Sequence, residues 1–258
     1  MKIARSSDLE TKIDIEFQGK LPGGSNITAR LLDKDDQFTI FQDNEKVCCI
    51  YEHCPALTLS PYDVACMRHA KKLTSSEFFS KYAKLSFEKE NQFPRAFFNF
   101  DFCSKKKNKR CPFLIEDKDN RLDARPLGCR LYPVIRSVDS NNVSFFALIE
   151  SSIPKRARNA KKFTLKSWLK HDHADKCLME SDRYESLINT VINQEEYDFS
   201  NQEKTDISSM VYTPDAFASD DLFGYMLKKP ESALEALEFG YAQAKGFVSI
   251  RTGFMKKN

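Results

Sequence analysis

Cysteine is the residue type whose number and spacing most clearly suggest chemistry in this sequence, with eight in 258 residues. Cys48, Cys49 and Cys54 lie within seven positions, close enough for two or three thiolates to reach one metal ion in a tight loop. Such a site suits zinc, which is tetrahedral with a Zn–S distance near roughly 2.3 Å, and it also suits an iron–sulfur cluster. Alternatively, one of the adjacent pair is a small buried side chain and the others are thiols without a ligand role, because cysteine is often buried.

Two more cysteines flank a basic run. Cys103 precedes the run Lys105–Arg110, and Cys111 follows it. The phenylalanine-rich segments on either side, within residues 93–114, predict a hairpin whose charged tip lies in water. This hairpin would bring the two cysteines together, which makes Cys103 an additional candidate ligand.

Two further groups of polar side chains are weaker candidates for metal binding. Cys66 and His69 are three positions apart in a predicted helix and could form a ligand pair. The His-Asp-His run at residues 171–173, with Cys177, has the density of a metal cluster. Its position at the polar end of a helical segment favours a solvated helix cap instead.

Five short segments occur in the same order as segments of a known family. They are Leu-Ser-Pro-Tyr-Asp-Val at 59–64, Thr-Ser-Ser-Glu-Phe at 74–78 with Tyr82, Cys-Pro-Phe-Leu at 111–114, Arg-Pro-Leu-Gly-Cys-Arg-Leu-Tyr-Pro at 125–133, and Thr-Leu-Lys-Ser-Trp-Leu at 164–169. Together they resemble the zinc- or iron-chelating cysteine-cluster family, the YkgJ-like proteins with a Cys-x-x-Cys-x-x-Cys-Cys pattern, in its long form. The resemblance runs from about residue 45 to the end and is strongest over residues 55–135.

The resemblance implies a metal site built from cysteine thiolates. The implied ligands are Cys48, Cys49, Cys54, Cys111 and Cys129, with Cys103, Asp119 and His53 as further candidates. Several family cysteines are missing, since Asp119 and the Ser151-Ser152 pair stand where members carry cysteine, and the first group is rearranged. Either zinc or iron is bound by fewer thiolates with an added oxygen or nitrogen ligand, or the chain has lost the metal and kept the fold. The first outcome is favoured because three thiolates and one other ligand are an ordinary zinc set.

Two arginines flank the signature cysteine Cys129. One interpretation of Arg125 and Arg130 is structural, as charge and hydrogen-bond support for nearby thiolates and carbonyl groups. The other is recognition of an anionic substrate by the planar guanidinium group. The structural interpretation is favoured.

Three classes of function follow from these features. The first is a metal-binding protein with a zinc or iron cofactor, the iron including an iron–sulfur cluster. The second is a protein-modifying enzyme, since the family is similar in its cysteine pattern to the flagellin lysine methylases, although no S-adenosylmethionine loop is recognisable. The third is a degenerate, metal-free scaffold that binds a protein or RNA partner. No glycine-rich phosphate loop, nucleophile elbow or His-Glu-x-x-His motif is present, so hydrolase and nucleotide-binding functions lose support.

The overall composition is that of a self-sufficient globular protein. A hydrophobic content of 41% in 258 residues is enough for a substantial core without disulfides. The net charge of +3 is too balanced to indicate nucleic-acid binding. No secretory signal or membrane span is recognisable, so we expect a cytoplasmic protein with no membrane partner, in which cysteines are thiols or metal ligands.

The elements that position these residues are expected to form an α+β fold. Residues 1–45 are predicted to be β-rich, residues 46–195 to form the metal-stabilised cysteine domain, and residues 196–258 to be a helical extension packed on it. Strands are expected at 13–17, 38–41 and 143–149, with a turn at 22–24. Helices are expected from Ser60 to about Lys72, from the capping box at Thr74, over residues 163–194, and from Thr213-Pro214 and Pro230-Glu231, the last running toward Gly246, with a linker over residues 193–206.

Overall fold

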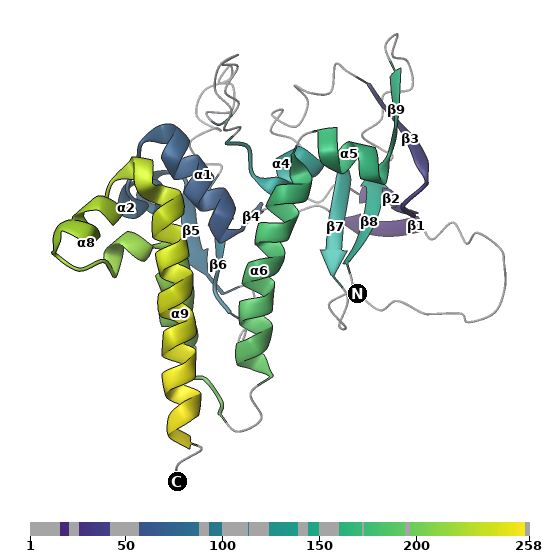
Figure 1. Cartoon of the computed structure of the whole chain (residues 1–258). Helices are drawn as coiled ribbons and strands as arrows, with labels where there is room; N and C mark the ends of the chain where they lie inside the picture. Colours follow the sequence, from purple (N-terminus) through teal and green to yellow (C-terminus); the bar gives the residue numbers. More distant parts are fainter. Residues whose placement is uncertain are drawn as a thin grey trace. The chain divides into compact units, whose positions relative to one another are not determined.

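The computed structural model describes residues 16–20, 26–41, 57–87, 93–99, 113, 124–138, 144–149, 160–171, 173–193 and 197–255. It is a mixture of helices and strands with helices at the C-terminal end, so the α+β class is confirmed (Figure 1). The chain divides into two compact units, the first made of Met1–Gln42 with Pro133–Lys166 and the second of Asp43–Tyr132 with Ser167–Asn258. Both units are discontinuous in sequence, whereas the three segments expected from the sequence are consecutive.

Antiparallel strands make up the first unit. One sheet has the order β1 (Glu16–Lys20), β2 (Asn26–Leu32), β8 (Ser144–Ile149), β7 (Val134–Val138), and a second sheet pairs β3 (Gln37–Phe41) with β9 (Ala160–Thr164). Alternate residues Phe38 and Ile40 are buried on β3, as a strand with one core face requires. The strands predicted at 38–41 and 143–149 are confirmed, and β1 overlaps the strand predicted at 13–17. Residues 13–15 and the turn at 22–24 lie outside the described residues.

The second unit holds a three-stranded antiparallel sheet and most of the helices. The sheet order is β4 (Thr58–Leu59), β6 (Arg95–Phe98), β5 (Ala83–Ser86). The helices are α1 (Pro61–Lys71), α2 (Ser75–Lys81), α4 (Leu127–Leu131), α5 (Leu165–His171), α6 (Ala174–Ile192), α7 (Asn201–Tyr212), α8 (Leu222–Leu227) and α9 (Ala233–Met255), with single 3-10 turns η4 (Pro214–Ala216) and η5 (Pro230–Ser232). The long helix α9 packs against α1 and α7. The described partners of β6 are β4 and β5, and the basic tip predicted for a hairpin over 93–114 lies outside the described residues.

Hydrogen-bonded caps fix where several helices begin. Ser60 with Asp63 and Thr74 with Glu77 form reciprocal capping boxes at the starts of α1 and α2. The box at Thr74 and the helix start at Ser60 are confirmed, and the return bond to Asp63 is an addition to the prediction. A third box, Ser200 with Glu203, starts α7. The linker expected over residues 193–206 is therefore wrong in its second half, because its polar residues include a helix cap and the exposed face of a helix.

Three other helix predictions need correction. The helix expected over residues 163–194 is two helices, since residues 163–164 end a strand and α6 starts afresh after His173, whose φ of 53° is left-handed. Thr213-Pro214 opens only the short turn η4, and the next helix, α8, starts at Leu222 after its N-cap residue Asp221. Helix α9 continues past Gly246 to Met255 because its buried face, which includes Ala244 and Val248, continues across that glycine. None of the helices that the structure describes is long and apolar enough to cross a bilayer.

A buried ion pair ties three helical segments of the second unit together. Arg68 on α1 is 1% exposed, and its Nη2 atom lies 3.2 Å from Oδ2 of Asp215 in η4. The same carboxylate accepts hydrogen bonds from the backbone N–H and the hydroxyl group of Ser75 at the start of α2. Phe78 lies on the same helix α2. Its side chain is fully buried, and its ring contacts that of Phe113 in an aromatic cluster. Phe79 and Tyr82, whose rings neighbour that of Phe78, are half-buried.

Asp215→Asn should destabilise the protein strongly. The substitution removes the carboxylate charge and leaves Arg68 buried without its counter-ion, which typically costs about 3 to 5 kcal/mol. The measurement is the free energy of unfolding from urea titrations. Glu238→Gln is the matched control, because Glu238 pairs with Arg183 at the surface and such pairs contribute at most about 1 kcal/mol. Equal losses in the two variants would contradict the role given to the buried pair.

Candidate functional site

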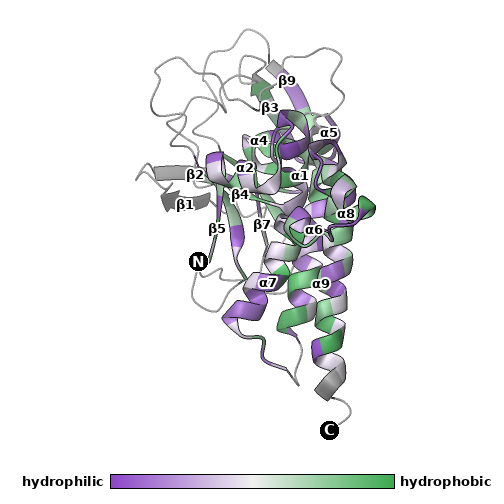
Figure 2. Ribbon diagram, turned by 90° about the vertical axis from the view of Figure 1, so that its left-hand side faces the viewer, coloured by the Kyte–Doolittle hydropathy of each residue, from purple (hydrophilic) through white to green (hydrophobic). Residues whose placement is uncertain are grey.

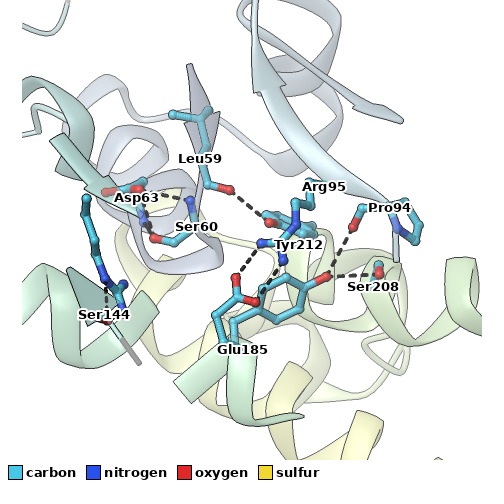
Figure 3. Close-up of polar contacts among 11 residues, drawn as sticks. Leu59, Ser60, Asp63, Pro94, Arg95, Ser144, Glu185, Ser208 and Tyr212 are labelled. Atoms are coloured by element: carbon cyan, nitrogen blue, oxygen red, sulfur yellow. Dashed lines mark hydrogen bonds and ion pairs between the residues drawn. The ribbon is translucent and has the colours of Figure 1, made fainter. Parts of the chain in front are cut away.

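The carboxylate of Asp63 is shared between the starts of two helices. Asp63 lies in the first turn of α1 and is only 3% exposed. Its Oδ2 atom accepts hydrogen bonds from the backbone N–H of Ser60 at 2.9 Å and from the Ser60 hydroxyl group at 2.8 Å (Figure 3). Its Oδ1 atom accepts one from the backbone N–H of Leu127, the first residue of α4, at 2.9 Å. One side chain therefore satisfies orphan donors at two helix N-termini.

A buried arginine faces this carboxylate. Arg130 is 6% exposed, and its Nε atom donates a hydrogen bond to the carbonyl oxygen of Arg125 at 2.8 Å. Burial raises the pKa of Asp63, while the hydrogen bonds from Ser60 and Leu127 and the charge of Arg130 oppose that rise. Arg130 thus supports both a carbonyl group and a buried carboxylate at the signature block, which agrees with the structural interpretation of this residue.

Helix α4 is also fixed along its length and at its far end. The indole Nε1 atom of Trp168 donates a hydrogen bond to the carbonyl oxygen of Leu131 at 2.9 Å. Gly128 lies so close to the side chain of Leu57 that a Cβ atom there would clash with Leu57 Cδ1. The segments 59–64, 125–133 and 164–169, singled out in the sequence, therefore meet around this single turn of helix.

Cys129 is the predicted metal ligand that the structure describes. It lies on α4, is half-buried, and its backbone N–H donates to the carbonyl oxygen of Pro126 at 2.9 Å. The other predicted ligands, Cys48, Cys49, Cys54 and Cys111, and the further candidates Cys103, Asp119 and His53, lie outside the described residues. The ligand set as a whole therefore stays a prediction.

Leu57 connects α4 to the aromatic cluster of the same unit. Its carbonyl oxygen accepts a hydrogen bond from the backbone N–H of Phe98 at 2.9 Å. The ring of Phe98 lies 5.7 Å from the fully buried ring of Phe113. Leu57 thus touches Gly128 on one side and the strand that carries Phe98 on the other.

Cys66 and His69, three positions apart on α1, have separate partners in the structure. The side chain of Cys66 hydrogen-bonds with Tyr62, whereas Nδ1 of His69 lies 3.1 Å from the carbonyl oxygen of Glu231. Burial raises the pKa of Cys66 to about 11, so this thiol stays protonated at neutral pH. A protonated, buried thiol is a poor metal ligand.

The region around His171 resembles a helix terminus. His171 stacks on Trp168, with ring centroids 5.7 Å apart, and His173 is the exposed N-cap residue of α6. Cys177 is buried, and Asp172 lies outside the described residues. Throughout the part of the chain that the structure describes, no three His, Cys, Asp or Glu side chains form a group that could hold a metal ion.

A second polar network lies nearby and has a structural role. The hydroxyl group of Tyr212 donates to the carbonyl oxygen of Leu59 at 2.9 Å, and that of Tyr184 donates to the carbonyl oxygen of Pro94 at 3.2 Å (Figure 3). Arg95 and Glu185 form a bidentate ion pair. Burial raises the pKa of both tyrosines, so they remain hydrogen-bond donors and are poor candidates for acid–base catalysis.

Asp63→Ala should lower the free energy of unfolding by about 2 to 4 kcal/mol, because the buried donors of Ser60 and Leu127 lose their shared acceptor. Chemical denaturation measures the loss. The control is Glu77→Ala, which removes the corresponding capping-box residue from the exposed start of α2. We expect a clearly smaller loss there, and equal losses would show that the bond to Leu127 contributes nothing.

Cys66 should contribute to a loss of stability at alkaline pH. Burial raises the pKa of Cys66 in the folded protein from its ordinary value of 9.0 to about 11, so its stabilising contribution is complete below pH 9 and is lost as pH rises toward 11. The free energy of unfolding should therefore fall by about 2 to 3 kcal/mol more in the wild type than in Cys66→Ala over this interval. Both proteins are to be measured at matched pH values. Parallel pH profiles would exclude the proposed effect of burial.

Sequence reasoning did not identify Asp63, Leu57 or Tyr212 as residues that build this site. Asp63 was recognisable only as a helix-start residue, through the Ser-Pro-Tyr-Asp pattern. Its second hydrogen bond joins residues 64 positions apart, and nothing in the local sequence indicates it. No family model, curated protein or solved structure matches the chain.

Proposed function

We propose that this protein binds zinc or iron, as an ion or as an iron–sulfur cluster, through the thiolates of Cys48, Cys49, Cys54, Cys111 and Cys129. Cysteine thiolates are the donors that both metals accept most readily in proteins. Cys103, Asp119 and His53 complete the coordination where a thiolate is lacking. The proposal concerns metal binding, and no reaction is assigned to the site.

The observation that carries this proposal is that three cysteines are tethered to residues that lie together. Cys54 is three residues before Leu57, Cys111 is two residues before Phe113, and Cys129 directly follows Gly128. A residue spans at most about 3.6 Å of extended chain, so Cys54 and Cys111 remain within about 11 Å and about 7 Å of their anchor residues. Because Leu57 contacts Gly128 and bonds to Phe98, which touches Phe113, all three anchors share one region.

The surroundings of Cys129 suit a metal ligand. Helix α4 is fixed by the bond from Leu127 to Asp63 at one end and by the bond from Trp168 to Leu131 at the other. A ligand on such a turn is held in place before the metal arrives, which lowers the entropy cost of binding. When bound, the metal would supply a cross-link between chain segments, and its binding free energy would add to the free energy of folding.

Metal analysis of protein purified without oxygen tests this proposal. We expect about one zinc per chain without visible absorption, or iron with sulfide and a broad band near roughly 400 nm. Cys129→Ser should lower the bound metal severalfold and lower Tm, because a thiolate ligand is lost. Cys177→Ser is the matched control, since Cys177 is buried in α6 and, among the described residues, belongs to no group that could hold a metal ion.

Two results would overturn the proposal. One is wild-type protein, freshly prepared without oxygen, that contains no metal and whose Tm does not respond to added zinc or iron. The other is a Cys129→Ser variant that keeps the full metal content of the wild type. The first result would favour the scaffold function.

A further inference from the structure

Helix α8 is a short helix held firmly to the second unit. The Oδ1 atom of Asp221 caps it by accepting a hydrogen bond from the backbone N–H of Gly224 at 2.8 Å. Gly224 itself is buried so closely against the backbone of Ser219 that any side chain there would clash. Leu227 at the other end is 3% exposed. These contacts fix both the position and the rotation of the helix.

The outward face of α8 is apolar. Leu222, Phe223, Tyr225 and Met226 are 78%, 60%, 62% and 51% exposed. At about 100° per residue they cover about 160° of the helix circumference, opposite the buried Gly224 and Leu227. Figure 2 shows hydrophobic colour on this helix. Clustered, exposed side chains of this size on a fixed helix are typical of an interaction site, whereas scattered ones are not.

Charges are arranged with opposite signs at the two ends of this face. Asp220 and Asp221 precede the helix, and Lys228 and Lys229 follow it. The ion pair between Lys228 Nζ and Asp220 Oδ1, at 2.8 Å, lies at the surface, where such pairs contribute little and exchange partners easily. The ammonium group of Lys229 lies 5.2 Å from the ring centroid of Tyr225, at the edge of the apolar face.

We propose that the apolar face of α8 is the contact surface for a second copy of this chain, with the two α8 helices antiparallel about a two-fold axis. In this arrangement each acidic end faces the basic end of its partner, so the patch is complementary to itself in charge as well as in hydrophobicity. An anionic lipid surface fits less well, because the two aspartates offset the two lysines. A stable interface buries about 800 Å² per partner, more than one two-turn helix supplies, so the dimer is weak and depends on concentration.

Sedimentation velocity of the full-length protein over a wide concentration range tests the dimer. The weight-average sedimentation coefficient should rise with concentration in the wild type. Met226→Glu should weaken dimerisation at least tenfold, because it places a carboxylate on the apolar face. Met179→Glu is the matched control, since Met179 is 62% exposed on α6, and it should dimerise as the wild type does. The metal content of each sample is measured in parallel, because the dimer does not depend on the proposed metal site.

Charge exchange tests the antiparallel arrangement. Asp220→Lys alone should weaken the dimer severalfold, and adding Lys228→Asp should restore it, because the charges at positions 220 and 228 are again opposite in sign. A wild type that is monomeric at all concentrations, or a Met179→Glu variant as defective as Met226→Glu, would overturn the proposal. So would binding to neutral phosphatidylcholine vesicles by a protein that does not self-associate. A double variant weaker than Asp220→Lys would overturn the antiparallel arrangement.

Discussion

The second unit depends on one buried carboxylate that has to satisfy two helices. A buried carboxylate is costly unless it is hydrogen-bonded, and Asp63 meets that condition with donors from Ser60 at the start of α1 and from Leu127 at the start of α4. The first N–H groups of each helix have no acceptor within the helix. The Asp63 carboxylate supplies an acceptor at both helix starts. The position of Cys129, two residues after Leu127, follows directly from this bond.

The same principle operates elsewhere in the second unit, where buried polar groups join segments that are distant in sequence. Asp215 connects η4 with both Arg68 of α1 and the start of α2. Tyr212 at the end of α7 reaches the carbonyl group of Leu59 in β4. Hydrophobic burial holds these segments close, but it is not directional, whereas each hydrogen bond allows only one register. The polar contacts therefore select one arrangement among the many that would bury similar apolar area.

Local patterns allowed the helix starts to be predicted, but not the long-range partners. Ser60 was identifiable as an N-cap residue before a proline, and Thr74 because a capping box is complete within four residues. The pairing of β2 with β8, more than a hundred residues later, and of Asp63 with Leu127 depends on which groups meet in space. Polar residues after Asn193 did not distinguish a linker from the exposed face of a helix, and the second part of that stretch belongs to α7. Cys129 could be singled out from the sequence, and the contacts that fix its helix could not.

These contacts also determine how a metal at the predicted ligands would act on the fold. The helices of the second unit already bury an extensive core, including Val64, Leu187 and Leu237, so they do not need a metal to collapse. Cys129, however, is covalently part of the turn whose first N–H binds Asp63. A displacement of Cys129 on metal binding would therefore act through Leu127 on the N-terminus of α1. A metal at Cys129 would therefore act most directly on the contact between α4 and α1, and it would also act on α6, which contacts α4 and is bonded to α9 through Arg183 and Glu238.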